Sequence, residues 1–428
     1  MYPNLYYFLK DALGIEPWGF TQYINSFGFF VALSFLLAAY LLATELKRKE
    51  GEGLIAGSTD KILVGAPATW GELTGNFLFG FIVGYKLLGV FLSSEDIHPQ
   101  EYIFSSKGSI LGGVLLAVLF AGLKYREKES QKLPKPEMRS VLVMPHQRVS
   151  DITVIAAIAG FAGAKLFDNL ENWDRFVQDP IGSFLSPSGL TFYGGLICAA
   201  IAIIWFARKK KIAILHLCDA VAPALMLSYA SGRIGCHVSG DGDWGIINKA
   251  YTLDGDGNIV KADPETFSRT IAAGGEYIDY LAREAGSVDK IPAAFVEGPS
   301  FLPNWFMAYN YPHNVNEVGT LIPGCQGPYC MQLNPLVFPT PLYEIIACTI
   351  LFMLLWSLRK KVKIAGQLFG VYLILNGMER FMVEKIRVNS TYDIGGFHPT
   401  QAEIISSMLM ISGILMLFIL KKVHPAKN

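Results

Sequence analysis

Long apolar runs recur along the whole chain and are separated by short polar or basic segments. Residues 21–44 contain no charged side chain and are soon followed by the basic block Lys47, Arg48 and Lys49. A helix that crosses a bilayer needs about 20 mostly apolar residues. The first run is therefore long enough and apolar enough to predict a membrane-spanning helix.

Eight further runs predict helices of the same kind, although Lys86 interrupts the first of them. Together with residues 21–44 they predict an all-α polytopic membrane protein with about nine transmembrane helices. The polar stretch 237–338 predicts a sizeable loop region between two of these helices. The eight runs cover about residues 72–93, 108–123, 150–170, 186–207, 214–236, 339–358, 366–386 and 401–420.

The basic residues are placed unevenly around these runs, and their placement indicates an orientation. Lys and Arg concentrate after every second run, and loops rich in these residues face the cytoplasm. We therefore expect the N-terminus and the loop 237–338 outside and the C-terminus inside. The segments expected inside are residues 46–61, 124–148, 208–211, 359–363 and 421–428.

This topology divides the chain into five parts. They are an N-terminal segment with the first helix (1–46), an inserted helix pair with a basic cytoplasmic loop (47–148), core transmembrane helices (149–236), an extracytoplasmic loop and head region (237–338), and C-terminal core transmembrane helices (339–428).

The composition agrees with a membrane protein. Of the 428 residues 52% are apolar and 17% are charged, whereas soluble domains carry about 25% charged residues. The formal net charge is zero, and nearly every basic block is explained by membrane topology. The charge pattern therefore gives no support to nucleic-acid binding.

The chain contains an apparent internal repeat. GFIVGYKLL (80–88) followed by residues 109–128 is echoed by GFAGAKLF (160–167) followed by residues 191–210. In both halves a Gly-rich helix with a Lys precedes a second helix that opens near Gly-Gly and closes on basic residues. The pattern favours duplication of a helix pair. The alternative is a compositional likeness, because small residues let membrane helices pack closely.

Several polar side chains fall inside the apolar runs. Charged groups in a membrane are costly and usually functional. With the orientation above, six helices place polar groups near the outer leaflet, which suits a site for an outer-leaflet lipid. These residues are Lys165, Asp168, Tyr193, Arg233, Glu344, Glu379, Arg380, Glu384 and Glu403.

The eighth run carries the clearest local pattern. Arg380 and Glu384 are four residues apart and Arg387 follows about one turn later, so a continuous helix would place all three on one face. An acid between two arginines fixes both guanidinium planes, as a phosphate-binding site requires. A structural ion pair between helices is an equally good explanation of this feature alone.

The segment SGRIGCHVSGDGDWG (231–245) combines Arg233 with several glycines and a Trp. Glycines let the backbone approach a ligand closely. His237 is either a hydrogen-bonding residue or a proton acceptor near neutral pH. Cys236, His237, Asp241 and Asp243 have no standard metal-ligand spacing, and the sequence predicts neither a metal nor another cofactor.

Cys325 and Cys330 are the two cysteines that lie close together in a hydrophilic stretch. If this stretch faces an oxidising compartment they can form a disulfide. They can also remain two free thiols.

Six segments in order, together with the topology, resemble the prolipoprotein diacylglyceryl transferase family. Residues 27–46 are similar to its first helix, and GRIGCHVSGDGDWG is similar to its G-R-[IL]-G-N…N-G-E-x-W-G signature. The other matching segments are TFYGGLI (191–197), PTPLYE (339–344), ERFMVEKIRVN (379–389) and HPTQAEIISSMLMISGI (398–414).

The chain departs from the family pattern at several positions. Tyr193 stands for the family's His before Gly-Gly, and Cys236 stands for its Asn. Residues 56–148 add a helix pair that the usual seven-helix form lacks. Further departures are Pro341 for a Gln, Asn376 for a Tyr, and one additional residue between Asp241 and Trp244.

The resemblance implies an enzyme, with no cofactor, in the bacterial inner membrane with its active site facing the periplasm. It would transfer the diacylglyceryl group of phosphatidylglycerol to the lipobox cysteine of preprolipoproteins. The alternatives are a transporter and a lipid-binding paralogue without this activity. The implied catalytic residues are Arg233, Arg380, Glu384, Tyr193 and His237, and the implied substrate-binding residues are Gly194, Gly195, Gly235, Gly240, Asp243, Glu344, Tyr343 and Arg387.

Overall fold

The computed structural model of the chain describes residues 1–92, 102, 107–186, 189–389, 392–393 and 395–423. These residues form two compact units. The first unit comprises Met1–Leu42 with Leu215–Asn428, and the second comprises Ala43–Ile214. Each unit is described by itself.

Helices occupy most of the described part of each of the nine runs that the sequence predicts as spans. Among the described residues, six helices are long and apolar enough to cross a membrane, so the prediction of an all-α polytopic membrane protein is confirmed. The total of nine stays a prediction. The six are α2 (Ser26–Gly51), α7 (Val149–Glu171), α10 (Phe192–Lys209), α11 (Ile214–Ser239), α15 (Thr340–Leu358) and α17 (Gln401–Val423).

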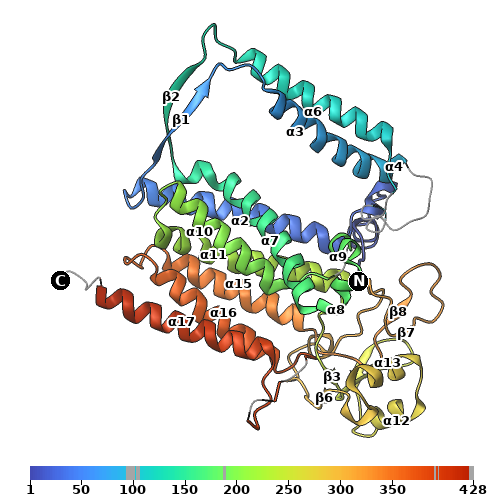
Figure 1. Cartoon of the computed structure of the whole chain (residues 1–428). Helices are drawn as coiled ribbons and strands as arrows, with labels where there is room; N and C mark the ends of the chain where they lie inside the picture. The colour runs from blue at the N-terminus through green and yellow to red at the C-terminus, as the bar shows by residue number, and fades with distance from the viewer. Residues whose placement is uncertain (93–101, 103–106, 187–188, 390–391, 394, 424–428) are drawn as a thin grey trace. The chain divides into compact units, whose positions relative to one another are not determined.

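The second unit contains two helix pairs. In the first pair, α3 continues through a π-helical turn into α4 and packs against α6. Strand β1 precedes this pair in the chain and strand β2 follows it, and the two strands form an antiparallel ribbon. In the other pair α7 packs against α10 (Figure 1). The bounds are β1 Ser58–Val64, α3 Trp70–Val83, η3 Gly84–Leu88, α4 Gly89–Leu92, α6 Ile110–Ser130, β2 Glu137–Val143, η4 Pro145–Arg148, α8 Trp173–Gln178 and α9 Pro180–Leu185.

Glycines bring the helices of each pair into backbone contact. A Cβ at Gly84 would lie 2.1 Å from the carbonyl oxygen of Gly112, and a Cβ at Gly163 would lie 2.6 Å from that of Gly194. Small residues at such crossings permit close packing in membranes. Gly194 thus has a packing role, and so has Gly195, where a Cβ would lie 2.9 Å from the Gly160 carbonyl.

Hydrogen bonds repeat at equivalent positions of the two pairs. Ser109 N donates to Tyr85 O at 2.9 Å, and Thr191 N donates to Ala164 O at 3.1 Å. These bonds match when Gly84 is superposed in sequence on Gly163, the alignment that defines the repeat. The contacts support duplication of a helix pair.

The lysine of each pair also plays the same part. Lys86 Nζ donates to Lys107 O at 2.7 Å, and Lys165 Nζ donates to Ser183 O at 3.3 Å. Each lysine therefore binds a carbonyl of the segment that joins its two helices. Burying an ammonium is costly unless carbonyls or acids surround it, so the lysines fix this segment onto their helices.

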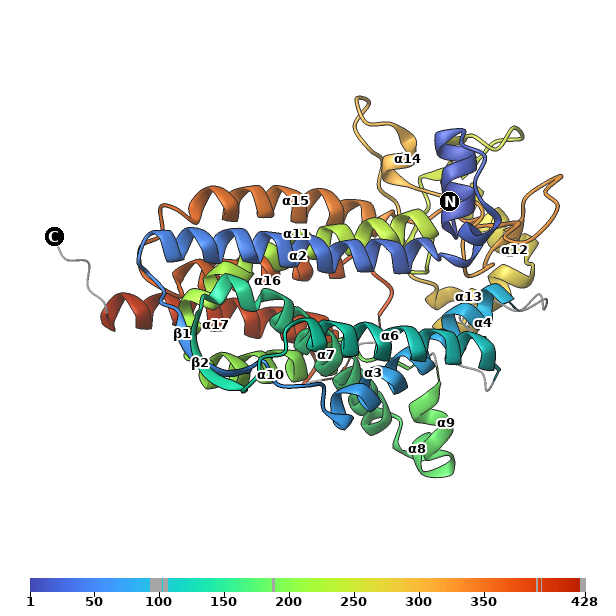
Figure 2. The ribbon, with the colours of Figure 1, turned by 90° about the horizontal axis from the view of Figure 1, so that it is seen from above.

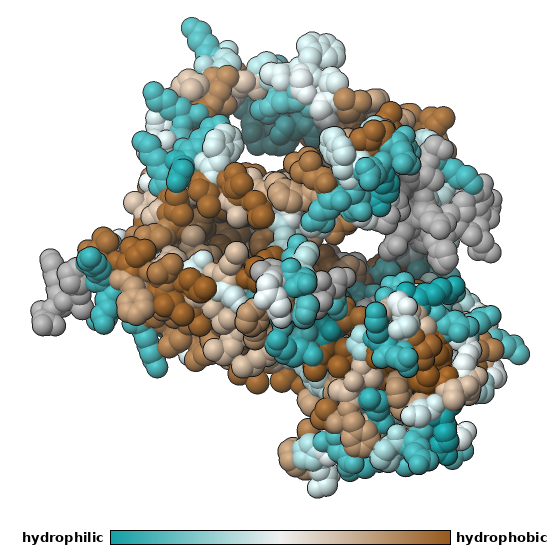
Figure 3. Space-filling view, turned by 60° about the horizontal axis from the view of Figure 1, so that its bottom comes forward, coloured by the Kyte–Doolittle hydropathy of each residue, from teal (hydrophilic) through white to brown (hydrophobic). Residues whose placement is uncertain are grey.

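The first unit gathers α11, α15, α16 (Gln367–Glu384) and α17, with the outer part of α2 against α11 (Figure 2). Their buried core contains Met226, Ala230, Cys348, Leu355 and Leu368. Apolar side chains predominate at the left of the space-filling view, over the helices near the C-terminus, whereas hydrophilic and apolar side chains are mixed at its lower right (Figure 3). This distribution is that of a helical bundle with its sides in lipid.

We call residues 240–338 the head. It lies at the end of α11 and α15 (Figure 2) and has its own core of Ile247, Tyr277, Ile291, Tyr311, Leu333 and Val337. Its elements, short sheets included, are β3 Ile247–Asn248, β4 Tyr251–Leu253, β5 Ile259–Lys261, α12 Thr266–Ala273, α13 Glu276–Ala285, η5 Val288–Lys290, β6 Ala293–Ala294, α14 Asn304–Met307, β7 Thr320–Leu321 and β8 Met331–Gln332.

Two further features complete the head. Cys325 and Cys330 form a disulfide, which decides between the two alternatives that the sequence leaves open. The N-terminal ammonium of Met1 donates to Pro312 O at 2.6 Å, which ties the start of the chain to the head. The N-terminal elements are α1 Leu5–Tyr7, η1 Phe8–Ala12 and η2 Gly19–Tyr23.

The glycine crossing of α7 and α10 gives a testable prediction. Gly163→Ala should lower the free energy of unfolding by about 1–3 kcal/mol, the usual cost of overpacking, because the new Cβ would meet Cys198 and the Gly194 backbone. The measurement is thermal unfolding in detergent. Gly122→Ala on α6 is the matched control, since no atom lies within 4 Å of its added Cβ. Equal melting temperatures for the two variants would contradict the prediction.

Candidate functional site

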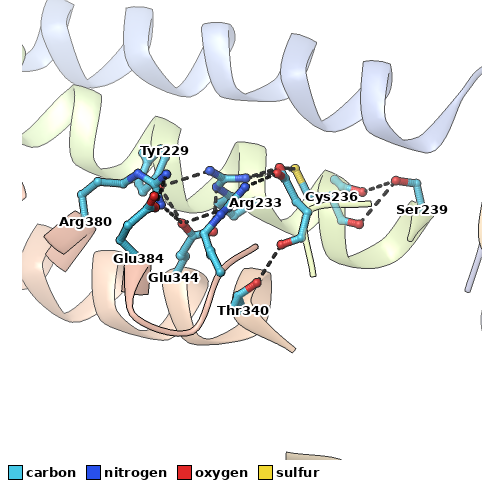
Figure 4. A network of polar contacts seen from close by, with 11 residues as sticks. Tyr229, Arg233, Cys236, Ser239, Thr340, Glu344, Arg380 and Glu384 are labelled. Atoms are coloured by element: carbon cyan, nitrogen blue, oxygen red, sulfur yellow. Dashed lines mark hydrogen bonds and ion pairs between the residues drawn. The ribbon is translucent and has the colours of Figure 1, made fainter. Parts of the chain in front are cut away.

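Glu344 is the centre of a polar network inside the first unit. Its side chain is 0% exposed, and three arginines approach it (Figure 4). Arg233 Nε lies 2.8 Å from Glu344 Oε2, while Arg380 Nη1 and Arg387 Nη1 lie 3.9 and 3.7 Å from Oε1. The network therefore joins α11, α15 and α16 through one buried carboxylate.

Two further acids, Glu384 and Asp243, also form ion pairs with these arginines. Arg380 Nη2 lies 2.7 Å from Glu384 Oε2, and Arg387 Nη2 lies 2.6 Å from Asp243 Oδ1. Arg233 also forms an ion pair with Asp243. One carboxylate of the head thus bridges two guanidinium groups.

The structure contradicts the expectation that Arg380, Glu384 and Arg387 share one face of a helix. Helix α16 ends at Glu384, so Arg387 lies beyond it and pairs with Asp243 and Glu344 rather than with Glu384. The second partner of Glu384 is the amide of Asn389, at 2.6 Å. The prediction was wrong for Arg387 because it assumed that the helix continues past Glu384.

The backbone explains how Asp243 reaches Arg387. Ile246 N donates to Ile386 O at 2.8 Å, and Gly245 N donates to Phe338 O at 2.8 Å. A Cβ at Gly245 would lie 2.5 Å from Ile386 O, so only glycine permits this approach without displacement. The start of the head is thereby fixed to the segment that leaves α16.

Two residues that the sequence did not single out belong to the network. Tyr229 Oη donates to Glu344 Oε1 at 2.9 Å and accepts from Arg233 Nη2 at 3.3 Å. Thr340 Oγ1 donates to the backbone oxygen of Asp243 at 2.7 Å. Tyr229 lies four residues before Arg233 on α11, and this spacing was the available signal.

Charge compensation keeps Asp243 ionised. Burial alone would raise the pKa of Asp243, but the guanidinium groups of Arg233 and Arg387 outweigh burial and lower it to about 2. Asp241 lacks a comparable partner, and burial, with the nearby charge of Asp243, raises its pKa. At neutral pH Asp243 therefore acts as a permanent anion between two cations.

Cys236, Asp241 and Asp243 are the residues that come nearest to a metal site. One ligand atom from each lies within 4.8 Å of the others. The carboxylate of Asp243 is already bound by two arginines, and the thiol of Cys236 lies 3.4 Å from that carboxylate and 3.7 Å from Arg233 Nη1. Two guanidinium cations beside the cluster disfavour a third positive charge.

The structure gives two predicted site residues partners in the head. His237 contacts the aromatic rings of Tyr309 and Tyr311, and its Nδ1 lies 3.4 Å from the hydroxyl of Tyr311. Tyr343 donates its hydroxyl proton to Phe306 O at 2.5 Å. Neither has a hydrogen bond with the network in the part of the chain that the structure describes.

The predicted glycines serve close packing. A Cβ at Gly235 would lie 3.0–3.3 Å from Phe27 and Phe30 of α2, and Gly240 has φ +64° with Asn314 beside it. Tyr193 lies at the start of α10 in the second unit, where its ring contacts Phe192. Substrate contacts of these residues stay predictions.

The fold and the site define a polytopic membrane protein in which three partly exposed arginines surround a buried carboxylate, an arrangement suited to an anionic ligand. The family model described as prolipoprotein diacylglyceryl transferase matches residues 109–419. The chain therefore belongs to the prolipoprotein diacylglyceryl transferase family, a family of transferases.

Relatives with the name phosphatidylglycerol–prolipoprotein diacylglyceryl transferase align over most of the chain. The protein of Corynebacterium glutamicum is 23% identical over 73% of this chain and 78% of its own length. That of Shouchella clausii is 25% identical over 75% of this chain and 90% of its own length. A shorter match, to the protein of Leptospira interrogans, is 34% identical over 27% of this chain and 43% of that protein.

The central carboxylate gives a prediction about stability. Glu344→Gln removes the charge that faces three arginines, and loss of one partner from a buried ion pair costs about 3–5 kcal/mol. We expect a marked fall in the melting temperature of the detergent-solubilised protein. Glu297→Gln, at an exposed pair with Lys261, is the control and should melt like the unchanged protein. A variant at Glu344 as stable as this control would show that the network is not held by its charge.

Proposed function

We propose that this chain transfers the diacylglyceryl group of phosphatidylglycerol to the lipobox cysteine of preprolipoproteins, at the outer leaflet of the bacterial inner membrane. The products are a thioether on the cysteine and glycerol phosphate. Family membership supports the reaction. The observation that carries the proposal is the convergence of three guanidinium groups on Glu344.

The arginines suit the phosphate of the lipid. Arg380 Nη1 and Arg387 Nη1 are buried atoms that face Glu344 at 3.9 and 3.7 Å and have no hydrogen-bond acceptor among the described residues, while both side chains are partly exposed. A phosphate oxygen near them would receive charge-assisted hydrogen bonds, which are stronger than neutral ones. The buried Glu344 and Glu384 would hold the guanidinium planes in place while the lipid enters.

The chemistry of the transfer sets two demands on the site. The S–H bond of the lipobox cysteine and the bond between the glyceryl carbon and the phosphate oxygen break, and an S–C bond forms. The phosphate oxygen leaves with the electron pair, and the thiol proton ends on it. Because a free thiol has a pKa of about 8.5 and nearby cations lower it, the arginines would favour the thiolate and the leaving phosphate together.

The departures from the family pattern leave this phosphate site in place. Tyr193 and Cys236 replace a His and an Asn of the family, while Arg233, Arg380 and Glu344 are present and in contact. Loss of the family His favours a second candidate function, that of a lipid-binding paralogue that keeps the phosphate site but does not transfer the lipid. Complementation of a bacterial strain depleted of its own transferase distinguishes the two, since only the transferase would restore growth.

The arginines give a direct test of the transfer. Arg233→Lys and Arg380→Lys keep the positive charge but lose the planar fork that binds two oxygens. We expect each to lower the rate of lipidation of a reporter preprolipoprotein in isolated membranes by about 100-fold, the effect of removing one oxyanion donor. Arg269→Lys in the exposed part of the head is the control. Wild-type rates in the two network variants would exclude these residues from the reaction.

The proposed orientation is tested separately. The head carries the disulfide, which agrees with an oxidising periplasm, and the basic segments would face the cytoplasm. A cysteine introduced at Gly257, in the β4–β5 turn, should react with a membrane-impermeant maleimide in intact spheroplasts. A cysteine at Gly53, after α2, should react only after lysis. The reverse labelling would show the opposite orientation.

A further inference from the structure

Glu379 is a buried acid beside the arginine network and forms no ion pair among the described residues. It lies on α16 directly before Arg380 and is 6% exposed. Neither of its carboxyl oxygens has a hydrogen bond of good geometry among these residues, and the donor beside it is the weakly donating thiol of Cys348. Buried acids are almost always paired, so one without a cation at this position requires an explanation.

Charge counting separates Glu379 from its neighbours. The three arginines of the network are each in ion pairs, and the acids that pair with them are Asp243, Glu344 and Glu384. Three cations and three anions balance. Glu379 lies outside this balance, as does Asp241 in the head, and a further negative charge in this low-dielectric interior would be uncompensated.

The groups around Glu379 come from three helices and the segment after α16. Glu344 and Cys348 face it from α15, and Tyr229 and Arg233 act on it from α11. Arg380 and Tyr372 share its own helix, and Arg387 follows that helix. On α17, which also packs along α16, Glu403 is paired with Lys385.

We propose that Glu379 holds the exchangeable proton of the site and that its carboxyl is neutral in the resting enzyme. This inference rests on the proposed function. Tyr229 and Glu344, which both act on Glu379 electrostatically, connect it to Arg233. Since Glu379 acts through these residues and is too buried to touch the lipid, it is a positioning residue.

The proton balance of the transfer is complete with this residue. As the bond between carbon and phosphate oxygen breaks, the oxygen takes a proton through the hydroxyl of Tyr229, and Glu379 supplies it, so that Glu344 keeps its ion pairs. The thiol proton then returns to Glu379 as the S–C bond forms. The net result is the one stated for the reaction, with the thiol proton on the released glycerol phosphate.

This role answers a question that the sequence leaves open. The family His is Tyr193 here, and His237 contacts aromatic rings of the head. Asp243 and Glu384 are held by arginines as anions. Among the described residues Asp241 and Glu379 form no ion pair; Asp241 lies in the head beside Cys236 and Asp243, whereas Glu379 directly precedes Arg380 on α16. Glu379 is therefore the carboxyl on the helices of the network whose protonation can change without breaking an ion pair that the structure contains.

Glu379→Gln tests the proposal, since Gln keeps the shape and the neutral charge but cannot release the proton. We expect kcat for lipidation to fall by about 100-fold, the lower range of general acid–base effects, with KM for phosphatidylglycerol nearly unchanged. The loss of activity of the wild type at alkaline pH should be absent in the variant. Glu379→Asp should recover much of the rate.

The second measurement does not depend on activity. Infrared spectra of the wild type should contain the C=O stretch of a protonated carboxylic acid, lost in Glu379→Gln and shifted in Glu379→Asp. Glu403→Gln is the matched control on α17 and should change neither spectrum nor pH profile. If Glu379→Gln is unstable, the kinetic and infrared measurements are made on Glu379→Met and Glu379→Asp instead.

The outcomes separate the two proposals. A wild-type kcat and pH profile in Glu379→Gln, a change in KM alone, or a carboxylic acid band that persists in both variants would overturn the role of Glu379. If the wild type itself does not transfer lipid, the proposed function fails, and the infrared band still decides whether Glu379 is neutral.

Discussion

The attraction of three arginines to the single buried carboxylate of Glu344 is the interaction on which the rest of this structure depends. It joins α11, α15 and the end of α16 in the interior of the first unit, where unpaired charges are costly. Each helix must place its polar residue at the same depth in the bundle. The network therefore fixes how the helices are positioned along their axes, in addition to forming the arginine site.

Much of the fold and part of the site follow from local patterns. Apolar runs locate the long helices because the hydrocarbon thickness sets their length. Charged residues inside such runs are rare enough that Arg233, Glu344 and Arg380 stand out without any structure. The partner of Arg387 could not be found in this way, because Asp243 is far away in the sequence. It is brought near by one backbone hydrogen bond between Ile246 and Ile386.

Other contacts have the same physical origin. His237 and Tyr343 lie next to the polar segments of their helices, and the structure gives each a partner in the head, Tyr311 and Phe306. Their contacts with substrate stay predictions. Tyr229 reads as an ordinary aromatic residue and proves to be a member of the network. Contacts made by a folded loop region have no periodic pattern in the sequence, whereas the length and period of apolar runs predict helices.

The two helix pairs of the second unit show how a chain absorbs an additional residue. Between the Gly-Phe and the Gly-x-Lys of the repeat, residues 80–86 contain one residue more than residues 160–165. Helix α3 runs directly into a π-helical turn at this place, η3, and such a turn accommodates one residue beyond the α-helical number. The glycine contact and the lysine contact beyond it are therefore kept in register.

The attachment of the head to the segment after α16 has a consequence for biogenesis. Residues 240–338 are synthesised before α16, yet Ile246 N binds the backbone oxygen of Ile386, beyond that helix. A nascent chain thus holds Asp243 without its second arginine until the segment after α16 has been made. The three-arginine site can therefore be completed only after the head and α16 are both in place, which makes it a late step in the assembly of the first unit.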